Sequence, residues 1–247
     1  MAILELRGIT KSFGGVRALD DVSIEVKENT LLGIIGPNGS GKTTLVNVIT
    51  GFIAPDGGNV VFKGKKTTGF PPYRIANMGI GRTFQMVRPF SHLPAFKNLI
   101  IPLSSKRVRS QASGGFGDKD AIALDVLEEV GFERDSSVPY KAANVLPHGY
   151  LKRLELARLI VLKSEVFILD ELFSGLSIAE VMSIIPIIEK ILGEGKTIMM
   201  VEHRLKELFR IADKVVVLNF GRKIKEGLPK EIMEDEEVKR AYLGVEV

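Results

Sequence analysis

Eight consecutive residues of this chain have the types and spacing that bind phosphate. Gly36-Pro37-Asn38-Gly39-Ser40-Gly41-Lys42-Thr43 matches the pattern G-x-x-x-x-G-K-[ST], with a short apolar run before it and a helical pattern after it. The glycines let successive backbone N–H groups point inward at an anion, and the N-terminus of the following helix adds positive potential. Lys42 can reach the β- and γ-phosphates, and the Thr43 hydroxyl can bind Mg²⁺. The segment predicts a nucleotide-binding site; a GTPase would also need an Asn-Lys-x-Asp segment, which the sequence lacks.

Two carboxylates follow a second apolar run. The run Val166-Phe167-Ile168-Leu169 precedes Asp170 and Glu171. At the C-terminal end of a buried strand, Asp170 can hold Mg²⁺ through water beside the phosphates. Glu171, one residue on, can polarise an attacking water as a general base. A buried strand that ends in a solvated acidic turn is the alternative, and the presence of a phosphate loop in the same chain favours the catalytic interpretation.

Two further polar residues join this set through the expected sheet. His203 follows the apolar run Thr197–Val201 and Glu202, and Gln85 ends the segment that begins at Gly81. Each would by itself be typical of a surface position. Ligands of parallel sheets lie at the carboxyl ends of the strands, so we expect His203 to contact the γ-phosphate.

Short apolar runs separated by helical patterns must position these residues. Alternation with period two at the start of the chain predicts strands around a Gly14-Gly15 turn. Later runs, rich in bulky apolar residues and separated by helical patterns, predict an α/β fold with a mainly parallel core sheet. The expected strands lie at about residues 3–6, 22–26, 31–35, 59–63, 166–169, 197–201 and 214–218.

The middle of the chain has mainly helical sequence patterns. Helical patterns at Asp120–Val130 and Tyr150–Lys163 flank Ser104–Gly117, a stretch rich in Ser, Gly and Arg that we expect to be a loop. Later, Ser177-x-x-Glu180 forms a capping box that starts a helix reaching about residue 192. Pro186 inside that helix predicts a kink or an interruption.

Composition excludes several classes of protein. The chain has 247 residues, of which 45% are hydrophobic and 26% charged, and a formal net charge of +4. Disordered chains have fewer apolar residues, and a membrane span would need about 18 consecutive apolar residues. With no cysteine there is neither a disulfide nor a thiolate site. We see no signal peptide and expect a cytoplasmic location, and the small charge gives no reason to expect a nucleic-acid partner.

Together these motifs resemble the ATPase subunits of ABC transporters. The phosphate loop, Gln85, Asp170-Glu171, Ser174-Gly175-Leu176-Ser177 and Glu202-His203 follow in that family's order and spacing over essentially the whole chain. The resemblance is especially marked for the ATPases of branched-chain amino-acid importers. Segments 50–52, 79–85 and 241–244 carry that part of the resemblance.

The resemblance implies one P-loop ATPase domain over residues 1–247, with an antiparallel β subdomain and a helical subdomain at about 88–163 inserted in the RecA-like core. ATP and Mg²⁺ would be its cofactors, and Gln85 would couple Mg²⁺ and water to transmembrane subunits. His203 would be the switch histidine, and Phe13 would stack on adenine unless it packs in the core. Met86–Leu103 would face the coupling helices of the membrane partner, or its apolar residues would form part of the helical core.

The expected site residues fall into three groups. Nucleotide binding is expected from Phe13, Gly36, Pro37, Asn38, Gly39, Ser40, Gly41, Lys42, Thr43 and Thr44; catalysis from Lys42, Gln85, Glu171 and His203; and metal binding from Thr43, Gln85 and Asp170.

One motif departs from the family. Two such subunits would form a head-to-tail dimer in which each signature segment, L-S-G-G-Q in the family, covers the partner's ATP. The matching segment here is Leu146-Pro147-His148-Gly149-Tyr150. Pro147 offers neither a hydroxyl nor an N–H, and His148 adds bulk where glycine allows close approach of the backbone. Because the hydrolytic residues are intact, we expect a heterodimer with a second, different ATPase subunit; sequence drift in a homodimer is the alternative.

The expected function is ATP hydrolysis that powers an importer for branched-chain or other amino acids. Transmembrane permease subunits would be the direct partners and a solute-binding protein an indirect one, at the cytoplasmic face of the cell membrane. The alternatives are an ABC ATPase that drives export or lipid extraction, and an ATP-binding regulatory subunit with low turnover.

Overall fold

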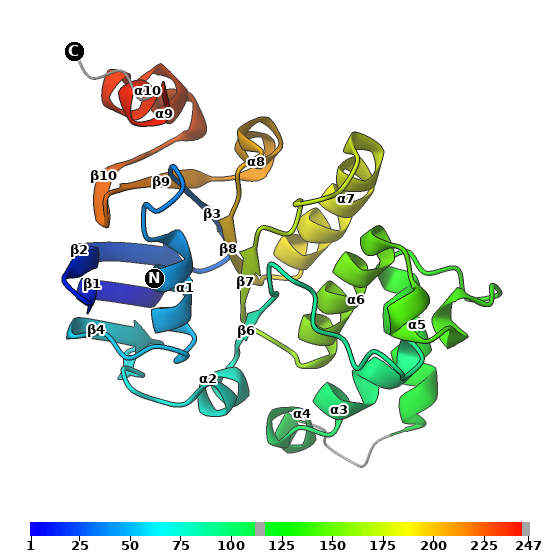
Figure 1. Cartoon of the computed structure of the whole chain (residues 1–247). Coiled ribbons are helices and arrows are strands. Elements are labelled where there is room, and N and C mark those ends of the chain that lie inside the picture. Colours follow the sequence, from blue (N-terminus) through cyan, green and yellow to red (C-terminus); the bar gives the residue numbers. More distant parts are fainter. Residues whose placement is uncertain (112–116, 244–247) are drawn as a thin grey trace.

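The computed structural model describes residues 1–111 and 117–243 and contains two β-sheets with helices between and beside them. Figure 1 shows an antiparallel sheet on the left, a core sheet in the centre and a group of helices on the right. Of the tetrapeptide 241–244 that contributed to the resemblance, Gly244 lies outside the described residues.

The antiparallel sheet has the strand order β2-β1-β4-β5. Its first two strands form a long hairpin around Gly14 and Gly15, both of which have positive φ, as the sequence predicted. The strands are β1 (Ala2–Phe13), β2 (Val16–Lys27), β4 (Gly57–Phe62) and β5 (Lys65–Lys66).

The core sheet has the order β10-β9-β3-β8-β7-β6. Its strands are β3 (Leu31–Ile35), β6 (Ile80–Arg82), β7 (Val166–Asp170), β8 (Thr197–Val201), β9 (Lys214–Asn219) and β10 (Arg222–Gly227). All neighbouring pairs are parallel except β9 with β10. The predicted α/β fold with a mainly parallel core sheet is therefore confirmed.

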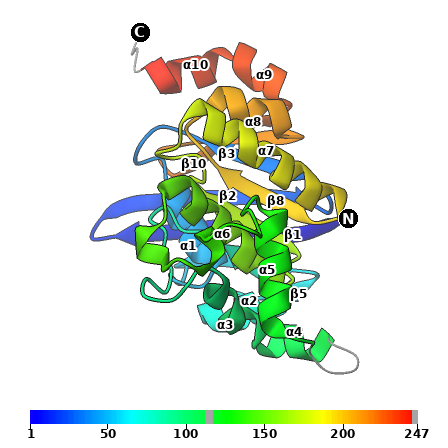
Figure 2. The same ribbon diagram turned by 90° about the vertical axis from the view of Figure 1, so that its right-hand side faces the viewer.

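Helices lie between the strands and after the last of them. They are α1 (Lys42–Ile49), α2 (Pro72–Met78), α3 (Ile100–Leu103), α4 (Lys106–Gln111), α5 (Lys119–Glu129), α6 (His148–Val161), α7 (Ile178–Gly193), α8 (Leu205–Ile211), α9 (Pro229–Glu234) and α10 (Glu236–Leu243), with 3₁₀ turns at Phe96–Leu99, Val138–Tyr140 and Ala143–Val145. Figure 2 shows α5, α6 and α7 in front of the core sheet and α9 and α10 at one end of the molecule.

Alternation along each core strand builds two hydrophobic cores. In β3, Leu31 and Ile35 face a core shared with the helices α3 to α8, whereas Leu32 and Ile34 face a core shared with α1 and the antiparallel sheet. The core sheet is thus covered on both faces, as its continuous apolar strands require. The carboxyl ends of these strands are where polar side chains can gather.

One local prediction was wrong in part, and one of the two alternatives at Pro186 is excluded. Ser104–Gly117 was expected to be a loop, but Lys106–Gln111 is helical in α4, where Arg107 is buried and donates to the backbone carbonyls of Lys163 and Met78. Residues 112–116 of that prediction lie outside the described residues. Pro186 was expected to kink or to interrupt its helix; the interruption is absent, because α7 is continuous from its capping box at Ser177 to Gly193.

Within residues 1–111 and 117–243, no helix has both the length and the apolar character needed to cross a bilayer.

Replacing Pro186 by alanine is expected to stabilise the protein. Pro186 is exposed in the interior of α7 and has no N–H for the carbonyl of Met182, one turn earlier. Restoring that hydrogen bond outweighs the greater freedom that alanine gives the unfolded chain, so P186A should raise the free energy of unfolding by about 2 kcal/mol. Thermal unfolding should show a higher Tm, while Glu189→Ala, an exposed control in the same helix, should shift it little. An unchanged or lower Tm for P186A would contradict this account.

Candidate functional site

The phosphate loop connects β3 to α1 and can be built only with glycine at two positions. Gly36 has a φ of 156°, and a Cβ there would lie 2.2 Å from the carbonyl oxygen of Leu218. Gly41 has a φ of 103°, and its Cβ would lie 2.5 Å from the carbonyl oxygen of Ala18. The loop is therefore packed closely against β9 and β2, with its backbone free to face a ligand.

Lys42 holds the loop in a closed turn. Its Nζ donates to the carbonyl oxygens of Gly36, at 2.7 Å, and Pro37, at 2.9 Å. Burial lowers the pKa of Lys42, and the nearby carboxylates Glu171 and Asp170 oppose that effect. A cation held against backbone carbonyl oxygens at the phosphate loop is a suitable partner for the phosphates of a nucleotide.

A cavity of about 180 Å³ lies against this loop. The loop residues Asn38 to Thr44 line it together with Ala18, Glu171 and His203. The structure thus brings the strand-end residues Glu171 and His203 to the phosphate loop, the arrangement that the parallel sheet predicted. The cavity can place a phosphate group opposite a carboxylate and an imidazole.

Glu171 is held by both of its carboxylate oxygens. Gln85 Nε2 donates to Oε2 at 2.7 Å, and His203 Nε2 lies 3.1 Å from Oε1. The backbone of Glu171 has a φ of 50°, which is uncommon for a residue other than glycine. Such conformations persist where the surroundings determine them, often at functional sites. The three residues can orient a water molecule and accept its proton.

Asp170 points to the α1 side of the core sheet. It shares that face with Val166 and Ile168 through the two-residue period of β7, and its side chain is buried. Arg82 Nη2 donates to Asp170 Oδ2 at 2.7 Å, while Nη1 of Arg82 donates to Asn47 in α1. The carboxylate of Asp170 is an oxygen ligand of the kind that Mg²⁺ prefers.

Several charged residues around the phosphate loop and the strand ends had no role predicted from the sequence. Arg82, Lys152, Glu155 and Glu202 are all nearly or fully buried around the site. A charged residue at a strand end or on a helix gives no sign in the sequence of whether folding buries it. The hydrophobic pattern of α6 could have indicated that Lys152 and Glu155 lie on its buried face. It could not have indicated which groups they contact there.

Phe13 and the signature segment lie outside the cavity lining. Phe13, at the end of β1, is 46% exposed, so it is not a core residue. Pro147 is the N-cap residue of α6, and Nε2 of the exposed His148 lies 3.2 Å from the carbonyl oxygen of Ser174. Tyr150 packs edge-on against Phe132 inside the helical segment.

Comparison with known proteins gives a consistent result. The sequence model of the family described as ABC transporter matches residues 19–174 of this chain. The chain is 34% identical to the high-affinity branched-chain amino acid transport ATP-binding protein BraF of Pseudomonas aeruginosa, over 98% of both chains. It is 32% identical to the probable branched-chain amino acid transport ATP-binding protein LivG of Archaeoglobus fulgidus, over 100% of this chain and 97% of the other.

An exporter component and a solved structure are also similar. The lipopolysaccharide export system ATP-binding protein LptB of Escherichia coli is 31% identical, over 99% of this chain and 98% of the other. The crystal structure of a nucleotide-free ATP-binding cassette from an ABC transporter superposes with a TM-score of 0.87 at 30% identity, covering 99% of this chain and all of the other.

Replacing Gly39 and Gly41 separately by alanine should distinguish the cost of backbone strain from the cost of a steric clash of the added Cβ. Both have positive φ, but a Cβ at Gly39 meets nothing within 4 Å, whereas one at Gly41 meets the Ala18 carbonyl. We expect Gly39→Ala to cost about 1–2 kcal/mol of stability through strain alone, and Gly41→Ala to cost more and to abolish nucleotide binding. Urea denaturation and ATP titration would measure both. Equal effects of the two variants would argue against the packing described for Gly41.

Proposed function

This chain belongs to the ABC transporter family, and from that premise we propose that it binds ATP with Mg²⁺ at the phosphate loop and uses it to power import of an amino acid. Its membership makes it an ATP-hydrolysing transport subunit. The observation that carries the assignment of the site is the Glu171 carboxylate, which faces the phosphate loop and is bound by Gln85 and His203.

The donor set of the site fits a nucleotide with Mg²⁺. The glycines of the loop leave a cradle of backbone that a Cβ would fill. Oxygen ligands for the metal would come from the hydroxyl of Thr43, the carboxylate of Asp170 and the side chain of Gln85. Bound Mg²⁺ would neutralise charge on the β- and γ-phosphates. Phe13, exposed at the end of β1, would provide the aromatic surface for adenine.

Hydrolysis would use residues that already lie together. Lys42 would exchange the carbonyl oxygens of Gly36 and Pro37 for the oxygens of the phosphates, so its charge would stay compensated. Glu171 would accept a proton from the water that attacks the γ-phosphorus in line. His203, 3.1 Å from Glu171, would hold that carboxylate and contact the transferred group.

ABC ATPase subunits of importers dimerise and work with transmembrane permeases. We propose that the ATPase partner of this chain is a different subunit. Pro147 is the N-cap residue of α6 and has no N–H, and the side chain of His148 occupies the start of the same helix. The surface that this chain would present to a partner's ATP is therefore altered, while its own Lys42 and Glu171 line the cavity at the phosphate loop.

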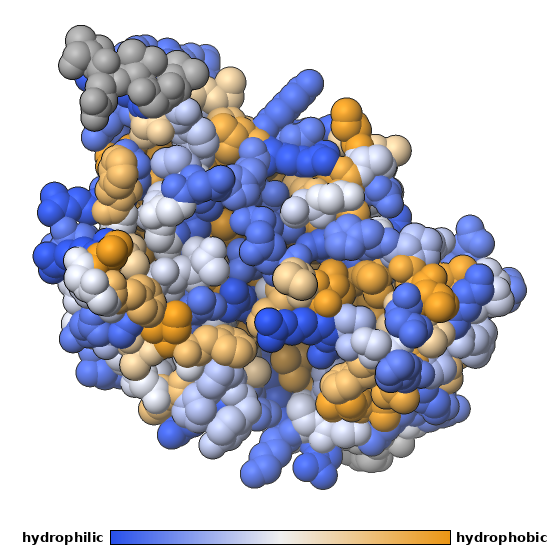
Figure 3. Space-filling model, viewed as in Figure 1, coloured by the Kyte–Doolittle hydropathy of each residue, from blue (hydrophilic) through white to orange (hydrophobic). Residues whose placement is uncertain are grey.

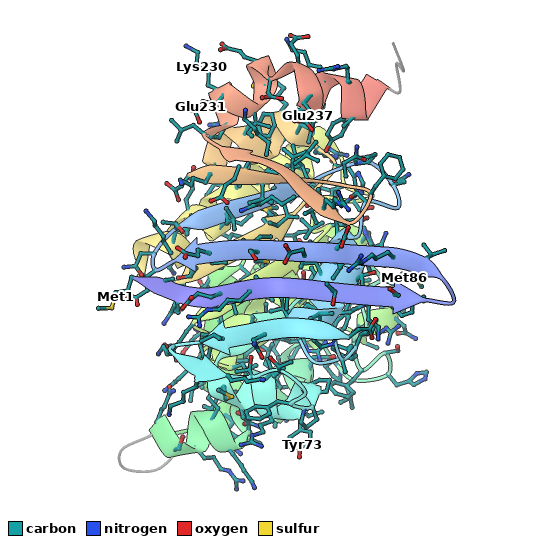
Figure 4. All side chains as sticks on the ribbon, turned by 90° about the vertical axis from the view of Figure 1, so that its left-hand side faces the viewer. Met1, Tyr73, Met86, Lys230, Glu231 and Glu237 are labelled. Carbon is teal, nitrogen blue, oxygen red and sulfur yellow. The ribbon has the colours of Figure 1, made fainter. Side chains whose placement is uncertain are left out.

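A cavity of about 300 Å³ supports a docking place for the permease. Phe52, Tyr73, Phe84 and Arg158 line it with residues of α2, α3 and β6, and Figure 4 shows Tyr73 and Met86 at the surface. On the face seen in Figure 3, hydrophobic residues gather over the helical segment.

Met86–Leu103 contains both exposed and buried apolar residues. Met86, Phe90 and Leu93 are exposed and available to a membrane partner, whereas Leu99 is buried in the core. We propose that the exposed half faces the permease.

The transported solute is proposed from the relatives. Proteins named for branched-chain amino acid transport are 32–34% identical over nearly the whole chain. Export is the second candidate, because an ATP-binding protein of lipopolysaccharide export is 31% identical. We further propose that residues 1–247 form a single domain, with the helices between β6 and β7 as its helical subdomain, acting at the cytoplasmic face of a membrane.

Glu171→Gln is expected to retain ATP binding and to slow hydrolysis by about 10²–10⁴-fold, because glutamine accepts no proton. ATP affinity and phosphate release would be measured together. Glu165→Gln, the same change just before the other end of β7, should lower stability through its lost ion pairs with Lys63 and Arg107 while turnover stays within a few-fold. A turnover of E171Q equal to that of the parent protein would remove Glu171 as the base.

Mixing should reveal the second ATPase subunit. The chain alone should show slow, non-cooperative hydrolysis, and adding its candidate partner ATPase subunit should increase turnover and make it cooperative in ATP. Full cooperative turnover by the chain alone would support the homodimer and overturn the proposal. The double variant Pro147→Ser/His148→Gly, which restores the family pattern, should increase the activity of the chain alone.

A further inference from the structure

Lys152 is a fully buried cation between the two catalytic segments. It lies in the second turn of α6, the helix that begins at the signature segment, and its relative exposure is 0%. Its Nζ donates to the carbonyl oxygen of Gln85 at 3.1 Å and to that of Glu171 at 3.2 Å. One side chain thus connects the backbones of the two residues whose side chains meet at the cavity.

Two buried carboxylates accept hydrogen bonds from backbone N–H groups of the same two segments. Glu155, one turn after Lys152 in α6, accepts from the backbone N–H of Phe84 at 3.0 Å. Glu202, at the end of β8, accepts from the N–H of Phe173 at 2.8 Å. Each catalytic segment is therefore bound on a carbonyl by Lys152 and on a nearby N–H by a carboxylate.

The charges of this cluster compensate one another. Burying a single charge is costly unless it is paired and hydrogen-bonded. Burial lowers the pKa of Lys152, and Glu155 and Glu202 are the strongest of the carboxylates that oppose this shift. Burial also raises the pKa of Glu202 to about 7, against hydrogen bonds from the Phe173 and His203 backbones.

Helix α6 contacts the segment after β7 at two points. His148, its first residue, lies 3.2 Å from the carbonyl oxygen of Ser174, and Lys152 binds Glu171 one turn later. Glu171 has a positive φ, a conformation that must be enforced by its surroundings. A displacement of the start of α6 would therefore reach both Glu171 and Gln85.

We propose that Lys152, with Glu155 and Glu202, is a positioning cluster that fixes Gln85 and Glu171 relative to α6 and relays engagement of the signature segment to the hydrolytic site. This inference rests on the proposed role of Glu171. Lys152 touches neither nucleotide nor water in this scheme; it acts through the backbone of the two residues that do.

The test is Lys152→Met, which removes the cation but keeps an unbranched side chain of similar length. In steady-state hydrolysis of MgATP by the full chain, kcat should fall by about 10–100-fold, the cost of misplacing a catalytic group by about 1 Å. KM should change by less than about three-fold, since the phosphate loop is untouched. The proposal is wrong if folded K152M keeps a kcat within three-fold of the parent protein.

Two further variants separate positioning from stability. Arg153→Met removes the neighbouring cation of α6, which binds the carbonyls of Val130 and Gly131 and the hydroxyl of Ser183. It should lower Tm and leave kcat unchanged. Lys152→Met/Glu155→Gln also removes one of the two carboxylates of this cluster whose charge Lys152 opposes, so it should recover part of the lost Tm but not kcat. Recovery of kcat together with Tm would mean that Lys152 only stabilises the fold.

The proposed function and this inference fail in different ways. If Glu171→Gln hydrolyses ATP like the parent protein, the role of Glu171 is wrong whatever Lys152 does. If Glu171→Gln is inactive and folded Lys152→Met is fully active, only the positioning cluster is wrong.

Discussion

Burial of both faces of the parallel sheet is the constraint on which the rest of the structure depends. Leu32 and Ile34 of β3 face α1 and the antiparallel sheet, whereas Leu31 and Ile35 face the helices on the other side. With both faces covered, polar side chains of the sheet can meet solvent only at the strand ends. The phosphate loop, Asp170, Glu171 and His203 all follow the carboxyl ends of core strands, so the same packing that forms the fold also assembles the site.

The buried charged side chains near the site need partners of opposite charge or hydrogen-bond acceptors. Several elements of the fold supply these partners. Arg82 of β6 pairs with Asp170 and also binds α1. Lys42 uses the carbonyls of its own loop, and Lys152 uses those of Gln85 and Glu171. A buried cation without such partners would destabilise the protein by several kcal/mol. The hydrogen bonds that satisfy these charges also connect the segments that carry Gln85 and Glu171 to the rest of the fold.

The helical segment between β6 and β7 connects surfaces that lie far apart in the chain. Helix α6 begins at the signature segment, carries Lys152 and Glu155 on its buried face, and contributes Arg158 to the cavity beside α2. The surface proposed for a second ATPase subunit and the surface proposed for a permease thus both include residues of this one helix.

The sequence by itself determined the local features with short-range physical causes. The phosphate loop follows from glycines at fixed spacing before a helix, the strand ends from apolar runs followed by carboxylates, and the start of α7 from the capping box at Ser177. The loop prediction failed where burial decides, since α4 forms in a polar stretch in which the buried Arg107 donates to backbone carbonyls. Only the tertiary structure decided that Arg82 pairs with Asp170 and that Lys152 binds two catalytic segments at once. These partners come from strands and helices distant in the chain, and the free energy of a buried charge depends on which of them the fold brings within hydrogen-bonding distance.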